Sequence, residues 1–413
     1  MLEKMIIQKE GEDWKEMRSA VSPIFTSGKL KKICTSINAV SADLEAHLDK
    51  FSASGEEVNA RDVSSKFAAE SFGKFGFGID VNIFEECPES ALFHKMVRRI
   101  LASDTTTLDA IKFAIAFSLP SLNKIFQFPT MDIEAVKFFI DVLQQTMEMR
   151  KNQTAKRNDM VELLSETLSG QNAQDEEVRR QVEEELEVAR PKKNAGIFKE
   201  EDIEDILVAN LLGFILVGQD FAASTISVCM CCLANNPNVQ ERLFGEVEQA
   251  SSKNVEIDYN TIMNMQYLDM VVHESLRIHF PTSDLERVCN KDYKVPGTDF
   301  TIPKGMMVQM SGSGIMMDER YFPNPREFNP ENFHPSNKMK RNPYASLIMF
   351  GIGPRNCIGS RLALLLLKTG IINVIRKFKI LPTARTPKKL EIDPKSTRAH
   401  VKGGIWVKFE RRM

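Results

Sequence analysis

The sequence lacks the features that mark several broad classes of protein. Its 413 residues contain seven cysteines, an odd number at irregular spacing, which argues against a disulfide framework and is typical of reduced thiols on the cytosolic side. The net charge is only −2, so no strong attraction to nucleic acid is expected. No internal repeat or linker divides the chain, and no glycine-rich nucleotide-binding motif is present. We therefore expect one domain over residues 1–413.

Long hydrophobic runs are also scarce. The N-terminal stretch MLEKMIIQKEGEDWKEMR has no apolar run that would serve as a signal peptide or anchor. Residues 206–234 are long and apolar enough to cross a bilayer, but Gln219 and Asp220 lie at their middle, where lipid would penalise an acid. We favour the central helix of a soluble core, which is also apolar all round. Asp220 is then a buried or cleft-facing acid.

The remaining pattern predicts a mainly α fold with a small β part. Helical spacing runs through residues 26–51, 60–78, 128–153, 258–280 and 360–378. After Phe280 the residue pattern changes to short apolar runs interrupted by Pro-Gly and Lys-Gly, which predicts small hairpins. An irregular proline-rich coil over 321–337 and a strand within 400–412 are expected to follow. The highly charged residues 171–205 indicate a solvated helix or a flexible connector.

The stretch FGIGPRNCIG, residues 350–359, surrounds one cysteine with glycines. Gly351, Gly353 and Gly359 allow tight turns and leave room for a flat group to approach. Backbone N–H groups in such a loop stabilise a thiolate at Cys357, and a helix beginning just after it favours negative charge there.

Arg355 adds a positive charge two residues before Cys357. The whole pattern describes a thiolate ligand for a large planar cofactor, and haem iron held by a cysteine is the known solution of this kind. The alternative is an ordinary glycine-rich turn with an incidental cysteine.

At these residues the chain resembles the cytochrome P450 family of haem-thiolate monooxygenases, whose cysteine loop reads F-G-x-G-x-R-x-C-x-G. Phe350, Gly351, Cys357 and Gly359 stand at defined positions of that loop. The resemblance covers essentially the whole chain and is nearest to microsomal animal members that metabolise drugs and toxins. It implies the P450 fold, haem b (iron protoporphyrin IX) as cofactor and Cys357 as its iron ligand. The family's N-terminal anchor and first helices have no counterpart here, so we expect an N-terminally truncated fold.

The resemblance also assigns groups that hold the two propionates of haem. DWKEMR matches the family's W-x-x-x-R, and its Trp14 and Arg18 lie four residues apart on one helix face. Arg287 in LERVCNKD and Arg355 in the cysteine loop match two further propionate donors. Burying two carboxylates requires such matched donors.

A second motif, ESLR, matches the family's E-x-x-R. Glu274 and Arg277 are three residues apart on a predicted helix and are expected to form a structural pair. Asn332 in PENF stands where the family has an arginine that completes this pair. We therefore expect the pair to lose its third member.

The apolar helix over 206–234 matches the family helix that lies over the haem face opposite the cysteine. Gly218 is expected to make room for oxygen, and Asp220 is the candidate for proton relay. Phe221 stands where the family usually has threonine, and a phenyl ring cannot donate or accept a hydrogen bond as that hydroxyl does. Thr282 and Ser283, with Phe221, are weaker candidates for contact with substrate.

The implied reaction inserts oxygen from O2 into a lipophilic small molecule: a xenobiotic, a steroid or a fatty-acid-like compound. The expected partners are NADPH-cytochrome P450 reductase, cytochrome b5 and a membrane surface, at the cytosolic face of the endoplasmic reticulum; no nucleic-acid partner is expected. One basic set is a candidate for reductase docking, with a plain solvated surface as the alternative: Lys29, Lys31, Lys32, Lys338, Lys340, Arg341 and Arg361.

Two other functions stay open. A haem-thiolate peroxide isomerase or dehydratase needs neither a proton relay nor a reductase, so Phe221 would not hinder it. A non-catalytic truncated product is the third reading. The sequence CMCC, with Cys229, Cys231 and Cys232 on one helix, indicates core packing rather than a metal site.

Overall fold

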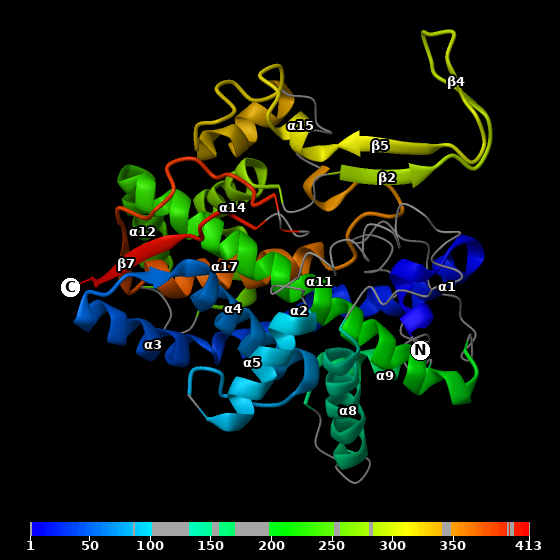
Figure 1. Cartoon of the computed structure of the whole chain (residues 1–413), viewed down its shortest axis with the longest axis horizontal. Helices are drawn as coiled ribbons and strands as arrows, with labels where there is room; N and C mark the ends of the chain where they lie inside the picture. The colour runs from blue at the N-terminus through cyan, green and yellow to red at the C-terminus, as the bar shows by residue number, and fades with distance from the viewer. Residues whose placement is uncertain are drawn as a thin grey trace.

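The computed structural model describes residues 2–85, 87–100, 132–150, 157–169, 198–251, 257–280, 284–340, 348–394, 396 and 400–412. Thr282, Ser283, Arg341 and most of the charged stretch 171–205 lie outside these residues. Helices dominate the described part, as predicted from the apolar spacing (Figure 1).

The helices occur in every predicted range, but residues 26–51 and 258–280 each contain two helices, and residues 88–100 and 160–168 form helices outside those ranges. Their bounds are α1 Gly11–Val21, α2 Ser27–Asn38, α3 Ser41–Ser54, α4 Ala60–Ser71, α5 Pro88–Ile100, α8 Ile133–Arg150, α9 Met160–Leu168, α11 Glu200–Asn235, α12 Pro237–Ser251, α13 Tyr259–Asn264, α14 Gln266–Ile278, α15 Gly312–Met316 and α17 Ser360–Ile375. Short turns of other helix types connect them, among them η3 Ser22–Phe25, the π-helical η4 Phe72–Phe77, η6 Pro330–Phe333 and η8 Ile348–Phe350.

Helix α11 crosses the centre of the molecule, with α4 and α17 packed along it (Figure 1). Among the described residues it is the one helix whose length and composition would suffice to cross a membrane, and 72% of its most apolar window is buried inside the protein. That burial agrees with the predicted core helix. Val217, at 42% exposure, departs from it and marks one open side near the middle of the helix.

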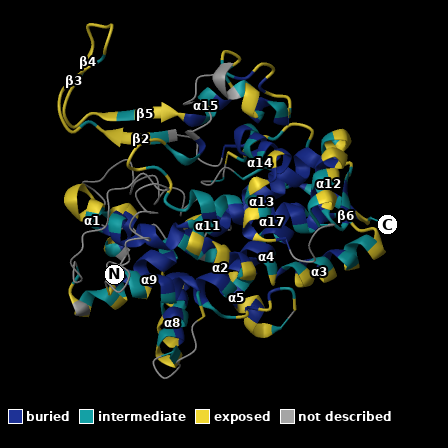
Figure 2. Ribbon diagram, turned by 180° about the vertical axis from the view of Figure 1, so that it is seen from behind, coloured by how far each residue is buried: buried dark blue, intermediate teal, exposed yellow. Residues whose placement is uncertain are grey.

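The β part consists of small antiparallel sheets. Strands β1 (Val58–Asn59), β7 (Trp406–Arg411) and β6 (Phe378–Pro382) form one sheet in that order. Strands β2 (Asp284–Val288) and β5 (Met307–Ser311) pair with Arg287 opposite Val308. Strands β3 (Tyr293–Lys294) and β4 (Thr301–Ile302) form the hairpin that projects from the body in Figure 2. The predicted hairpins and final strand are therefore confirmed.

Candidate haem-thiolate site

The cysteine loop is closed by its own backbone. The N–H of Cys357 donates to the carbonyl of Phe350 at 2.6 Å, and the N–H of Asn356 donates to the carbonyl of Gly353 at 2.9 Å. Gly351 and Gly353 have φ angles of 78° and 79°, the left-handed region that favours glycine. These turns leave the residue Cys357 exposed.

The charge around Cys357 differs from expectation in one respect. Although the residue is exposed, burial of its sulfur among loop atoms has the largest effect on the thiol and raises its pKa. The N–H of Gly359 and the positive charge of Arg18 act in the opposite direction, and Arg18 rather than Arg355 is the arginine that does so. Desolvation therefore outweighs the Gly359 N–H and Arg18 in this loop, and a cation bound at the sulfur would favour the thiolate.

Arg18 ties α1 to the loop. Its Nη1 donates to the backbone oxygen of Asn356 at 2.9 Å, and its Nη2 donates to the side-chain Oδ1 of the same residue at 2.7 Å. The residue is 5% exposed, and its Nε is buried without a hydrogen-bond partner among the described residues. Burial is the main cause that lowers the pKa of this guanidinium. Arg18 therefore has a donor to spare beside the cysteine.

Arg355 lies over the indole of Trp14, with its Cζ 4.1 Å from the ring centroid. Its pKa is lowered by burial and then by the positive charge of Arg287. Arg287 itself donates to the backbone oxygen of Glu286 at 2.7 Å. In the described part of the chain, none of these arginines or Arg18 forms an ion pair with a carboxylate. Glu10 offsets part of the positive charge at Arg355 without forming an ion pair, so the arginines remain suited to a ligand that carries its own carboxylates, as haem does.

Helix α11 turns an apolar face toward this loop. Phe214, Val217 and Phe221 share one helix face by their spacing, and Val217 is the exposed member. The ring of Phe214 meets that of Phe25 edge-on, with centroids 5.4 Å apart. A Cβ added to Gly359 would lie 3.5 Å from Phe25 as well. Phe25 therefore links the open face of α11 to the cysteine loop.

The structure gives Gly218 a packing role. A Cβ at this position would stand 2.5 Å from Cζ of Phe72, closer than real side chains approach. The phenyl ring of Phe72, at the start of η4, thus fills the room that the glycine leaves on this side. Space for oxygen at Gly218 stays a prediction.

Asp220 lies three residues after Val217 but, unlike Val217, is buried. It is 1% exposed and forms an ion pair with Arg61 of α4. Nε2 of His400 lies 3.5 Å from the same carboxylate oxygen. Neither partner could be predicted from the sequence, because neither stands at a recognisable spacing from Asp220. The proton-relay candidate is therefore a buried acid held by Arg61 of α4 and by His400 of the segment before β7.

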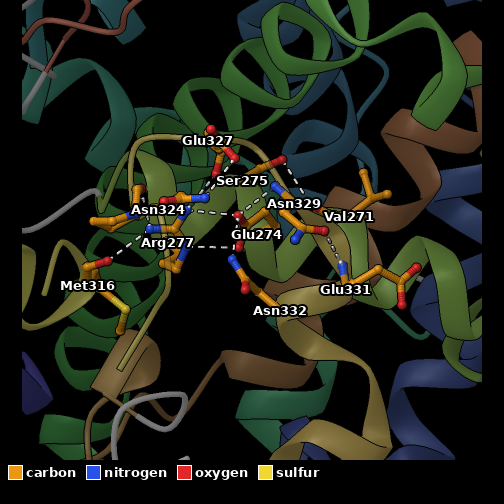
Figure 3. A network of polar contacts seen from close by, with 11 residues as sticks. Val271, Glu274, Ser275, Arg277, Met316, Asn324, Glu327, Asn329, Glu331 and Asn332 are labelled. Carbon is orange, nitrogen blue, oxygen red and sulfur yellow. Dashed lines mark hydrogen bonds and ion pairs between the residues drawn. The ribbon is translucent and has the colours of Figure 1, made fainter. Parts of the chain in front are cut away.

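The predicted pair of Glu274 and Arg277 is fully buried, with both side chains 0% exposed (Figure 3). Arg277 donates Nε and Nη2 to the two carboxylate oxygens of Glu274, each at 2.8 Å. Its Nη1 also donates to the carbonyls of Met316 and Pro325, and its Nη2 to that of Glu327. One arginine thereby fastens the proline-rich coil to α14.

The expectation that this pair loses its third member is wrong. Nδ2 of Asn332 donates to Glu274 Oε1 at 3.1 Å, and the N–H of Asn329 donates to the same oxygen at 2.9 Å. The amide supplies one hydrogen bond without a charge. Burial raises the pKa of the Glu274 carboxyl, and Arg277 and these donors act against the rise.

The cysteines of CMCC pack in the core as predicted. Burial raises the pKa of Cys229 and of Cys231 to about 12, so both stay protonated and unreactive. Within the described residues no group of three or more histidine, cysteine or acidic side chains is placed to hold a metal ion.

Comparison with known proteins agrees with this geometry. The profile of the cytochrome P450 family matches residues 1–404. The chain is 31% identical over 408 residues to the probable cytochrome P450 6g2 of Drosophila melanogaster, covering 96% of this chain and 74% of that protein. It is 31% identical over 393 residues to cytochrome P450 3A18 of Rattus norvegicus, covering 95% and 73%. Matches of this extent, together with the cysteine loop, show that the chain belongs to the cytochrome P450 family of haem-binding monooxygenases.

Proposed function

We propose that this monooxygenase acts on a lipophilic small molecule and takes its electrons from NADPH through a flavoprotein reductase. The observation that carries the substrate class is the face of Phe214, Val217 and Phe221 on α11, which presents no hydrogen-bonding side chain. An apolar face linked through Phe25 to the cysteine loop favours a hydrophobic substrate near the reacting centre.

The residues around the cysteine loop fit haem. Cys357 would hold the iron, while Arg18, Arg287 and Arg355, with Trp14, would hold the propionates. The chemistry that haem supplies when bound is activation of O2, with insertion of one oxygen atom into the substrate and reduction of the other to water. The reaction consumes two protons, so a route for protons across the buried α11 is required. Asp220 is the acid of α11 that we assign to this route.

The exposed Lys31 and Lys32 of α2 form a basic surface that supports docking of an acidic partner. Lys31 is exposed, while Lys29 pairs with Glu166 at 3.4 Å and Lys32 donates to Asn158 at 2.8 Å. We assign this surface to the reductase, with cytochrome b5 as a second donor, and place the protein at the endoplasmic reticulum membrane.

Peroxide isomerisation or dehydration is the second candidate, and two observations favour it. Phe221 offers no hydroxyl at the position of the family threonine, and Asp220 is engaged by Arg61. Such a reaction rearranges a hydroperoxide and needs no protons delivered across the helix.

Turnover with each oxidant distinguishes the two candidates. Purified enzyme is given either NADPH with reductase or a fatty-acid hydroperoxide, and products are measured. Monooxygenation predicts oxidised lipophilic product only with NADPH and reductase, and a Phe221→Thr variant should raise product formed per NADPH. Rearranged hydroperoxide without NADPH, and no gain in Phe221→Thr, would favour the second candidate. A purified chain that takes up no haem would favour a non-catalytic product.

A further inference from the structure

The buried acid of α11 is part of a three-residue cluster that joins distant parts of the chain. Nη2 of Arg61, at the start of α4, donates to Oδ1 of Asp220. The same nitrogen lies 2.7 Å from Nε2 of His400. That imidazole nitrogen is 3.5 Å from Oδ1 of Asp220. Three side chains from α11, α4 and the segment before β7 therefore share one contact point.

Exposure increases from the acid outward. The side chain of Asp220 is 1% exposed, whereas those of Arg61 and His400 are 24% and 19% exposed. A carboxyl buried to this degree does not exchange protons with water directly. The two partners reach both the carboxylate and the solvent, so they form the connection between them.

The chemistry of the partners separates their roles. A guanidinium only donates hydrogen bonds and does not release its proton in proteins. Since Arg61 donates toward Nε2 of His400, that nitrogen is the acceptor and the neutral ring carries its proton on Nδ1. An imidazole exchanges protons readily. His400 is therefore the member of the cluster able to pass a proton inward.

Hydrogen bonds of its backbone fix the position of His400. Its N–H donates to the Oγ of Ser396 at 3.2 Å, and its carbonyl accepts from the N–H of Asp393 at 2.8 Å. The ring is thus positioned by the turn that precedes β7 rather than by α11 itself.

We propose that His400 and Arg61 form the proton-entry site for Asp220, with Arg61 orienting the acid and His400 transferring the proton. A proton from solvent binds Nε2 of neutral His400, and the resulting imidazolium no longer accepts from Arg61. The new Nε2–H bond then breaks as an O–H bond forms at Oδ1 of Asp220. The ring returns to neutral, and the carboxyl becomes uncharged. This inference rests on the proposed role of Asp220 in monooxygenation.

Substitutions in the holoenzyme test the proposal. We expect His400→Gln, which keeps a polar side chain but carries no proton, to lower product formed per NADPH by about three- to tenfold and to raise the solvent deuterium isotope effect. Arg61→Lys should retain more coupling than Arg61→Gln, because it keeps the charge. His334→Gln is the matched control, since that ring contacts Ser336 outside the cluster. The reduced, carbon-monoxide-bound spectrum checks folding of each variant.

A measurement without turnover accompanies these variants. In 15N-histidine-labelled enzyme, the ring signals of His400, assigned with His400→Gln, should shift in Asp220→Asn, whereas those of His334 should not. Unchanged His400 signals would overturn the inference. Loss of coupling in Asp220→Asn with parental coupling in His400→Gln would also overturn it, while leaving the proposed function intact. Parental coupling in Asp220→Asn would instead overturn the role of Asp220 on which the inference rests.

Discussion

Arg18 of α1 holds Asn356, the residue before the exposed Cys357, through two hydrogen bonds of 2.9 and 2.7 Å. These residues are 338 positions apart in the chain. The contact fixes the edge of the cysteine loop against α1 and places a positive charge near the sulfur. The geometry of the proposed iron ligand, Cys357, therefore depends on a residue at the other end of the sequence.

Arg18→Lys should weaken this hold. A lysine keeps the charge but cannot make two parallel hydrogen bonds, so we expect a loss of about 1–3 kcal/mol in the free energy of unfolding. Denaturant titration measures it. Arg326→Lys, at an exposed position outside the site, is the control and should change stability by less than about 0.5 kcal/mol. Equal losses in the free energy of unfolding for the two substitutions would contradict the role of Arg18 in holding the cysteine loop.

Gly218→Ala should destabilise α11. The new methyl group would meet the ring of Phe72 at 2.5 Å, and overpacking of this kind costs about 1–3 kcal/mol. Gly245→Ala on α12 is the matched control, because nothing lies within 4 Å of its added Cβ, and it should be stabilising by about 0.5–1 kcal/mol.

The thermal midpoints of both variants can be compared directly. Phe72→Leu combined with Gly218→Ala should recover part of the loss, since the two positions are in contact. Additive losses in the double variant would show that Phe72 is not the obstacle.

Asn332→Ala should show how much the hydrogen bond from Asn332 to Glu274 contributes to stability. The substitution removes a hydrogen bond to a buried carboxylate, and we expect a loss of about 1.5–3 kcal/mol in the free energy of unfolding. Asn337→Ala, which removes a bond from the same coil to the carbonyl of Glu331, is the comparison and should cost less. A smaller loss at Asn332 than at Asn337 would mean that Arg277 alone holds the coil.

Asp269 gives the fold a pH dependence with a definite sign. Burial acts to raise the pKa of its carboxyl, but His273 and the fully buried Lys368, 2.7 Å away, hold that pKa well below its usual range. The stabilisation is therefore present above about pH 4, the value for an unfolded chain, and is lost as pH falls toward the folded pKa.

Asp269→Asn should accordingly destabilise the protein at pH 7 and progressively less below pH 4. We expect about 2 kcal/mol at pH 7, less than for a fully buried pair, because the Asp269 side chain is 42% exposed. Urea titrations between pH 3 and 7 measure the difference. Asp299→Asn, on an exposed turn, should show no such trend. A difference that grows on acidification would reverse the assigned sign.

The sequence predicted those parts of the molecule that depend on short, local residue patterns. The turns at Gly351 and Gly353, the i, i+3 pair of Glu274 and Arg277 and the apolar spacing of α11 all lie within short stretches. The hairpins could also be predicted, because Pro-Gly and Lys-Gly interrupt short apolar runs there.

Contacts between distant residues could not be read in this way. Arg61 and Asp220 are 159 positions apart, and Arg61 and His400 are 339 apart, so no periodicity connects them. The packing of Phe72 on Gly218 depends equally on how α4 and η4 lie against α11. The prediction for Asn332 was wrong. Its amide lacks the charge of the arginine that it replaces, yet the coil brings it within 3.1 Å of Glu274.

The absorption spectrum of the reduced, carbon-monoxide-bound protein reports the iron ligand. With Cys357 as the iron ligand, the parent chain should show the strongly red-shifted main band of a thiolate-bound haem, and Cys357→Ser should lose it. Cys289→Ser, at a half-buried cysteine outside the loop, should keep the band. An unchanged red-shifted band in Cys357→Ser would contradict the account.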